Sequence, residues 1–307
     1  MHVAATSESA SDFHLDRRLL RRRCAAAAAT CDGADVLARE IARRMDERLD
    51  YIRHAPTRIV DLGCGTGADL PRLAERYPDA ELIGIDFAEP MVARARGRTG
   101  KPVGLLRKLI GGGRRLPVIA ADATALPLAR GSVSMLWSNL MLPGLDDPLP
   151  ALTEAHRVLE VGGMLMFSTL GPDTLKELRA ALSGRSGERV HRFIDMHDIG
   201  DALVKAGFSD PVMDMEMLTL SYTGLDELFA DLRASGSNNA STARPRGLSG
   251  RHGWAAARAS YERLRSDGRL PASFEVIQGH AWKAAPRTTE DGRSIVRFQP
   301  RPQHTPG

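Results

Sequence analysis

The stretch Ile59-Val60-Asp61-Leu62-Gly63-Cys64-Gly65-Thr66-Gly67 decides the fold, because an apolar run passes directly into a glycine-rich turn. Glycine lets the backbone turn sharply and lets a ligand approach main-chain atoms without interference from a Cβ. The spacing is Gly-x-Gly-x-Gly, whereas the Gly-x-Gly-x-x-Gly of dinucleotide sites brings a pyrophosphate to a helix N-terminus. The stretch therefore predicts a strand, a ligand-binding turn and a helix, and it disfavours a phosphate ligand.

Outward from this turn, short apolar runs alternate with helical segments. The predicted strands cover residues 58–62, 81–85, 116–120, 133–137 and 164–169, and the predicted helices between them cover 69–77, 90–96 and 149–159. Strict alternation requires crossover connections, which give a parallel sheet with helices on both faces. We therefore expect an α/β fold with a doubly wound, mainly parallel sheet of seven strands.

The same patterns divide the chain into four segments. We expect an N-terminal segment with a lid helix (1–57), a ligand-binding core (58–170), cap helices and final strands of the same domain (171–283), and a disordered tail (284–307). The lid helix follows from an apolar stripe through Val36, Ile41, Met45 and Leu49. Residues 99–115 are expected to form a surface insertion.

Composition places the chain among ordinary globular proteins. It has 307 residues, of which 43% are hydrophobic and 26% charged, and a net charge of +4. Most of its 42 basic residues are arginines, but 38 acidic residues and 5% aromatics disfavour a nucleic-acid partner. No run approaches a membrane span of roughly 20 apolar residues. Three cysteines without a Cys-x-x-Cys pair indicate a reducing compartment, so we expect a cytoplasmic protein without a zinc site.

Two carboxylates end later strands of the predicted sheet. Asp86 ends Leu82-Ile83-Gly84-Ile85-Asp86, where a carboxylate can accept hydrogen bonds from both hydroxyls of a ribose. Asp122 follows the third strand, where it can meet an amino group, although an aspartate here can also serve only as a turn or N-cap residue.

Together these features resemble class I S-adenosylmethionine-dependent methyltransferases. The resemblance rests on Asp-Leu-Gly-Cys-Gly-Thr-Gly, the acidic end of the second strand, Asp122 and Gly162-Gly163. It implies a Rossmann-like methyltransferase fold with S-adenosylmethionine as cofactor. The residues it implies at the cofactor are Gly63, Gly65 and Gly67 behind the methionyl part, Asp86 at the ribose, Asp122 and Ala123 at the adenine, Asp61 at the loop and amino group, and Asn139.

Further stretches resemble the malonyl-[acyl-carrier protein] O-methyltransferases of biotin synthesis. They are residues 137–140, 166–179, 193–200 and 279–282, so the likeness runs from about residue 20 to 283. It implies methyl transfer to the free carboxylate of a malonyl thioester on acyl carrier protein or coenzyme A. A carboxyl group with a pKa near 4 is ionised at pH 7, so this reaction needs no general base and we expect no catalytic side chain.

A carboxylate held in a fixed orientation favours an arginine fork over a lysine. Arg233 and Arg179 are the candidates, although in a chain so rich in arginine each can instead lie on a solvated helix face. Asn139 can likewise be a plain turn residue. The histidines have no spaced partner and are interpreted as packed or surface residues.

Two positions depart from the malonyl-methyltransferase pattern. Pro143-Gly144 stands where the family carries a tryptophan, and Cys31 stands where an aromatic side chain would close the lid. Both departures concern substrate closure, so two alternatives stay open: a methyltransferase acting on another small acceptor, and a non-catalytic accessory or assembly protein on the same fold.

Overall fold

The structure is a computed structural model, and it describes residues 14–99, 116–183, 187–247 and 250–286. The predicted surface insertion, nearly all of the predicted tail and the first thirteen residues lie outside this part of the chain. Within it, the strands form one sheet in the order β3-β2-β1-β4-β5-β7-β6. Their bounds are β1 Arg58–Leu62, β2 Glu81–Asp86, β3 Val118–Ala120, β4 Val133–Ser138, β5 Leu159–Leu170, β6 Ser209–Tyr222 and β7 Leu270–Trp282.

The sheet is parallel from β3 to β5, and β7 runs antiparallel to both β5 and β6. β1, β2 and β4 are buried along nearly their whole length, because helices cover both faces of a parallel sheet. The observed order and pairing confirm the predicted doubly wound, mainly parallel seven-stranded sheet.

Helices pack on the two faces around separate apolar cores. One face carries α2 (Val36–Arg48), α3 (Leu70–Arg76) and α4 (Glu89–Thr99), and the other carries α6 (Leu149–Val158) and α8 (Met196–Lys205). The apolar stripe predicted for the lid helix is confirmed in part: Ile41 and Met45 of α2 are fully buried against the sheet, and Leu49 just after it is buried, but Val36 at its start is exposed.

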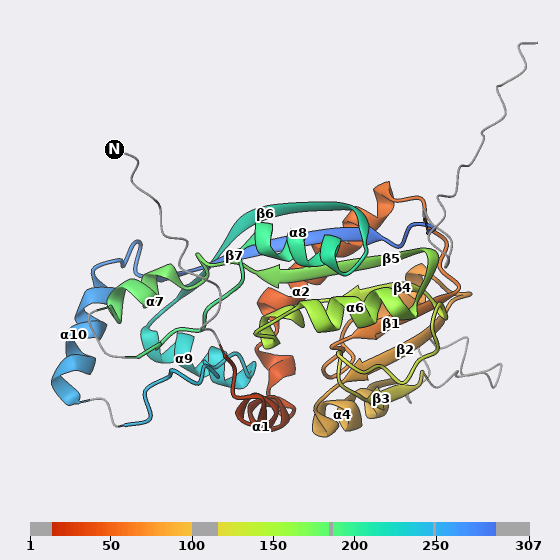
Figure 1. The fold of residues 1–307 in the computed structure, drawn as a ribbon. Helices are drawn as coiled ribbons and strands as arrows, with labels where there is room; N and C mark the ends of the chain where they lie inside the picture. Colours follow the sequence, from red (N-terminus) through yellow and green to blue (C-terminus); the bar gives the residue numbers. More distant parts are fainter. Residues whose placement is uncertain (1–13, 100–115, 184–186, 248–249, 287–307) are drawn as a thin grey trace, which may run out of the picture.

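Further helices lie off the carboxyl ends of the parallel strands (Figure 1). They are α1 (Arg17–Ala27), α7 (Lys176–Ala181), α9 (Leu225–Ala234) and α10 (Arg251–Glu262). The last three belong to the predicted cap. Because ligands of open α/β sheets bind outside the carboxyl ends of the strands, this arrangement places the cap over the expected site.

Several element predictions need correction. The apolar pattern did not reveal α1, because arginine and alanine leave it without a long apolar stripe. In the cap, α7 begins only at Lys176, because Leu175 takes a left-handed conformation (φ 55°) just before it. β5 begins at Leu159 rather than at residue 164, because Gly162 and Gly163 pair through backbone hydrogen bonds with Lys283.

Candidate active site

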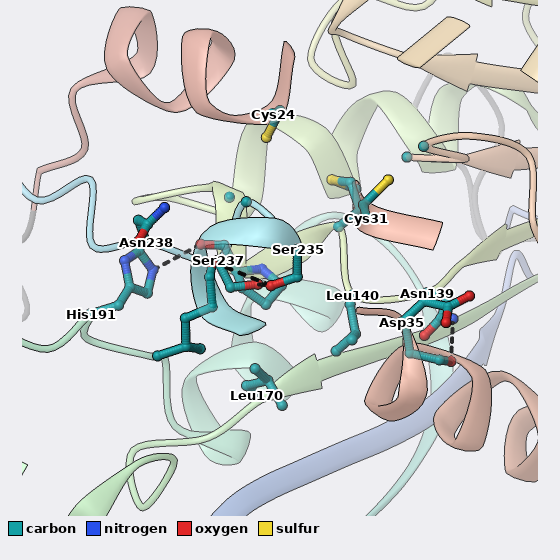
Figure 2. Close-up of a pocket in the computed structure, with 18 of the residues that line it drawn as sticks. Cys24, Cys31, Asp35, Asn139, Leu140, Leu170, His191, Ser235, Ser237 and Asn238 are labelled. Carbon is teal, nitrogen blue, oxygen red and sulfur yellow. Dashed lines mark hydrogen bonds between the residues drawn. The ribbon is translucent and has the colours of Figure 1, made fainter. Parts of the chain in front are cut away.

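A cavity of about 450 Å³ lies at the carboxyl edge of the sheet, which is within the usual size range of small-molecule sites. Its floor is the glycine-rich turn after β1, and its walls come from α1, the segment before α2, and the cap. Figure 2 shows Cys24 and Cys31 on the side of the N-terminal segment, Asn139 and Leu140 after β4, and His191 from the cap. Residues far apart in the sequence therefore meet around one cavity.

The glycine-rich turn takes a backbone shape that other residues adopt only with strain. Gly63 has φ 81°, and a Cβ there would lie 2.6 Å from the Cβ of Met141. Gly65 has φ 53°, and a Cβ there would meet no atom within 4 Å. Both glycines line the cavity, whereas Gly67 does not and packs against α4. The turn thus leaves its main chain open to a ligand at Gly65.

Asp86 holds this turn in place. Its two carboxylate oxygens accept hydrogen bonds from the backbone N–H groups of Gly65 (3.0 Å) and Ala88 (2.8 Å). Burial raises the pKa of Asp86, while these hydrogen bonds act against that rise. Each oxygen has a second lone pair, so the side chain can also accept from a ligand in the cavity that it lines.

Asp61 is the most deeply buried carboxyl group of the site. Burial raises its pKa well above the usual value, and the neighbouring carboxylates of Asp69 and Asp86 raise it further. Within the described residues, its Oδ2 atom has no hydrogen-bond partner. A buried polar atom without a partner is costly, so this oxygen is matched to a donor that a ligand would bring.

A smaller pocket of about 50 Å³ continues past Asp86 and is lined by Asp122 and Ala123. Asp122 accepts hydrogen bonds from the backbone N–H and hydroxyl of Thr124, and it pairs with Arg17 of α1 at 2.6 Å. Burial alone would raise the pKa of Asp122, but the Thr124 hydrogen bonds and the charge of Arg17 lower it overall. The carboxylate is therefore both a turn residue and part of the pocket.

Asn139 is held by a network that ties four elements together. Its amide nitrogen donates to the carbonyl of Ala38 (3.0 Å) and to Asp69 (3.2 Å), and its amide oxygen accepts from Ser168 (2.9 Å). Ser168 in turn accepts the N–H of Leu140, a residue with φ 56°. Asn139 lines the cavity, but these partners occupy its amide group, so it shapes the wall.

The N-terminal segment closes the cavity through contacts at both ends. Asp32 accepts a hydrogen bond from Thr66 of the glycine-rich turn and pairs with Arg98 of α4 at 2.6 Å. At the other end, the segment just before α1 bridges to the cap, where Leu15 pairs with Ser241. The segment before α2 therefore contacts the glycine-rich turn and the cap together, as expected of the predicted lid.

Comparison with known proteins identifies the family of this chain. Residues 60–167 match the family described as a methyltransferase domain. A malonyl-[acyl-carrier protein] O-methyltransferase from Laribacter hongkongensis is 49% identical over 292 residues, which cover 94% of this chain and 97% of the relative. One from Gallionella capsiferriformans is 48% identical over 94% of this chain and 98% of the relative. The chain belongs to the malonyl-[acyl-carrier protein] O-methyltransferase family.

Solved structures agree with the fold of this family member. A putative methyltransferase from Haloferax volcanii, solved with an activator protein, covers 88% of this chain at a TM-score of 0.55 and 17% identity, and the match spans 100% of that chain. A putative methyltransferase from Bacillus halodurans covers 80% at a TM-score of 0.53 and 14% identity, spanning 99% of that chain. At such identities the likeness concerns the fold alone, and it confirms the predicted Rossmann-like methyltransferase fold.

The two candidate arginines differ in their placement. Arg233, at the end of α9, lines the cavity and is exposed. Arg179 is not part of the lining, because its guanidinium donates to the backbone carbonyls of Pro172 (3.1 Å), Thr174 (2.9 Å) and His191. We therefore correct its assignment: Arg179 holds the cap segment in shape. Arg39 and Arg189 also line the cavity, and the sequence patterns did not single them out.

Both departures from the family pattern lie at the cavity. Cys31, Pro143 and Gly144 are among its lining residues. His191, expected to be merely packed, also lines the cavity, where its Nε2 lies 3.0 Å from the carbonyl oxygen of Pro143. Burial lowers the pKa of His191, which favours the neutral ring. Its contact joins the cap to the segment after β4.

Two further observations concern metal binding and membrane spans. In the described part of the chain, no group of three or more His, Cys, Asp or Glu residues is placed to hold a metal ion, and the expectation of a metal-free site stays a prediction. No helix among the described residues has the length and apolar character needed to cross a membrane.

Proposed function

We propose that this chain transfers a methyl group from S-adenosylmethionine to the free carboxylate of a malonyl thioester on acyl carrier protein, an early step of biotin synthesis. The observation that carries the proposal is similarity to malonyl-[acyl-carrier protein] O-methyltransferases over nearly the full length of the chain. The matched length includes the cap as well as the glycine-rich turn. The cytoplasmic setting predicted from the sequence is consistent with this role and stays a prediction.

The cavity fits the cofactor on three counts. Asp61 keeps a buried oxygen without a partner, Gly65 leaves its main chain open, and Asp86 has acceptor capacity beside the turn. We assign the amino group of the cofactor to Asp61, its ribose to Asp86, and its adenine to the pocket of Asp122 and Ala123. When bound, the cofactor supplies a methyl group on a positively charged sulfur.

On the acceptor side, the cap supplies an apolar wall and a cation. The wall contains Leu175, Leu178, Phe229, Leu232 and Phe274, and Arg233 stands at its edge. The arginine orients the acceptor carboxylate, while the apolar wall excludes water, which strengthens the attraction between opposite charges. Orientation of this kind contributes up to roughly 7–11 kcal/mol in well-aligned reactions, and the site needs no general base because the acceptor carboxylate is already ionised at pH 7.

Label transfer tests the proposal. Purified protein with methyl-labelled S-adenosylmethionine and malonyl-acyl carrier protein should yield a methyl ester that mild base hydrolyses. Malonyl-coenzyme A and other small carboxylic acids serve as competing acceptors. Transfer only to another acid would support a different acceptor. Tight cofactor binding without transfer to any acceptor would support the non-catalytic alternative.

The Arg233→Ala variant tests the assignment of the carboxylate ligand. Loss of a charge-assisted hydrogen bond costs about 1.5–3 kcal/mol, so KM for the malonyl acceptor should rise about 10- to 150-fold. Affinity for S-adenosylhomocysteine should stay within about twofold. Arg53→Ala, which changes an exposed arginine before β1, is the matched control. Equal loss of acceptor and cofactor binding would instead indicate a role of Arg233 in folding.

A further inference from the structure

Helix α1 begins with the sequence Arg-Arg-Leu-Leu-Arg-Arg-Arg, and its arginines have different surroundings. Arg17 pairs with Asp122, and Arg23 donates to the carbonyl of Asn239. Arg21 lies over the ring of Phe87, with its guanidinium carbon 5.6 Å from the ring centre. Arg18 and Arg22 are exposed, and no salt bridge joins either of them to an acidic side chain of the described residues.

The two faces of this helix have different surroundings. Leu20 and Cys24 lie one turn apart and line the cavity. Arg18 and Arg22 also lie one turn apart, and successive helical positions rotate by about 100°, which puts them on the opposite side of the helix. The outer face of α1 therefore presents two arginines that form no salt bridge with the described residues, directly behind a wall of the active site.

This arrangement is unfavourable for the helix itself. Arg17 and Arg18 occupy its first turn, which contains no acidic residue, and positive charge there opposes the helix dipole. Arg18 and Arg22 repel each other at the i, i+4 spacing. Asp16 caps the helix, and the hydrogen bond from the N–H of Leu19, the charge of Arg244 and that of Arg22 lower the pKa of its carboxyl group, but this carboxylate already pairs with Arg244 at 3.3 Å. Local stability does not explain these arginines, so an anion from outside the described residues is their natural partner.

We propose that Arg18 and Arg22 form a docking surface for the acidic carrier protein that brings the acceptor thioester. The inference rests on the proposed function for the identity of the acceptor. A partner docked on the outer face of α1 has its tethered group beside a cavity wall that the same helix forms. A nucleic acid is the less suited occupant, because two arginines without salt bridges to the described residues offer few phosphate contacts.

The test compares acceptors with and without the carrier in the variant R18E/R22E. Glutamate at position 18, in the first turn, favours the helix, and the repulsion between positions 18 and 22 is similar for two glutamates and two arginines, so this variant should keep α1 folded. We expect kcat/KM for malonyl-acyl carrier protein to fall at least about 10-fold, because charge complementarity governs association. The rate with malonyl-pantetheine, which lacks the carrier, should stay within about twofold.

A matched control carries the same change of charge elsewhere. R53E/R130E alters exposed arginines that precede β1 and β4, at the opposite edge of the sheet. This control should keep the activity of the native protein towards the carrier-bound acceptor. An equal loss in both double variants would overturn the proposal, as would an equal loss with both acceptors, which would mean that the lid itself had been damaged.

Direct binding separates this inference from the proposed function. Fluorescently labelled acyl carrier protein without a malonyl group should bind the native protein, with an affinity that weakens at least about 10-fold in R18E/R22E and at high salt. Absence of binding overturns the docking surface even if malonyl-pantetheine is methylated. Binding without methylation of any malonyl thioester overturns the proposed function and leaves the docking surface standing. Tighter binding of a single-stranded RNA through the same arginines would also overturn the carrier assignment.

Discussion

Asp61 illustrates how one side chain can favour ligand binding over stability. Its carboxyl group is buried and one oxygen lacks a partner in the described part of the chain, so the ionised form is poorly stabilised when no ligand is present. An ammonium group placed against this oxygen would favour the ionised form. Binding of such a cation should therefore release a proton.

This setting predicts the behaviour of Asp61→Asn. The pKa of Asp61 is higher in the folded than in the unfolded protein, so its contribution to stability is complete below about pH 4 and is lost as the pH rises through the folded pKa. Asparagine does not titrate. In thermal scans without ligand, the unfolding temperature of the variant, relative to that of the native protein, should therefore increase as the pH rises from 4 to 7.

The same variant should also change ligand binding. Asp61→Asn should bind S-adenosylhomocysteine more weakly, and calorimetry in buffers of different ionisation enthalpy should show that the proton release of the native protein has disappeared. A difference in midpoint that does not change with pH, together with unchanged affinity, would remove Asp61 from the role assigned here.

At the scale of elements, two left-handed leucines mark where the cavity wall is under strain. Leu140 follows β4 and Leu175 precedes α7, and both line the cavity. Such a conformation costs a side-chain-bearing residue roughly 1–3 kcal/mol and persists only where the surroundings enforce it. Ser168 provides this for Leu140 through a 2.9 Å hydrogen bond to its N–H, and the carbonyl of Ser273 does so for Leu175 at 2.6 Å.

Ser168→Ala should lower the free energy of unfolding by about 1–3 kcal/mol, because it removes partners of the Leu140 N–H and the Asn139 amide oxygen. Leu140→Gly removes the backbone strain at this position, since glycine adopts positive φ freely. The hydrogen bond from the Leu140 N–H to Ser168 then has less strain to offset. Denaturant unfolding of the single and double variants should therefore give a combined loss smaller than the sum. Additive losses would show that Ser168 does not hold the turn.

The lid is the second element whose behaviour can be measured. Arg17 ties α1 to Asp122, and this partly exposed ion pair should be worth up to about 1 kcal/mol. Arg17→Ala should accordingly speed the dissociation of S-adenosylhomocysteine about two- to fivefold in stopped-flow experiments, with Arg53→Ala as control. A rate unchanged by Arg17→Ala would mean that the ion pair does not hold the lid closed.

At the scale of the whole molecule, one cavity is lined by the lid, the core and the cap. A ligand that binds only the folded state should stabilise all three together. S-adenosylhomocysteine at 100 times its Kd should add about 2.7 kcal/mol, which raises the unfolding midpoint by on the order of 5 °C in a single transition. Two separate transitions, with only one of them shifted, would show that lid or cap unfolds independently of the core.

Much of this architecture could be predicted from local sequence. The run from Ile59 to Gly67 and the acidic end of β2 fall where the structure has a strand, a turn and a cavity edge, because alternation and glycine spacing are properties of neighbouring residues. The doubly wound, mainly parallel character of the sheet followed from the same alternation, whereas the order β3-β2-β1-β4-β5-β7-β6 comes from the structure. Helix α1 escaped prediction, since its burial depends on contacts with the cap and α4 rather than on a period of its own.

The sequence by itself determined the doubly wound sheet, the glycine-rich turn and the carboxylates at the strand ends, all of which depend on backbone geometry and residue order. Only the tertiary structure decided which arginine reaches the cavity: Arg233 lines it, whereas Arg179, an equal candidate by pattern, is bound to backbone carbonyls. The reason is physical, because the direction of a long side chain depends on which donors and acceptors folding brings within its reach.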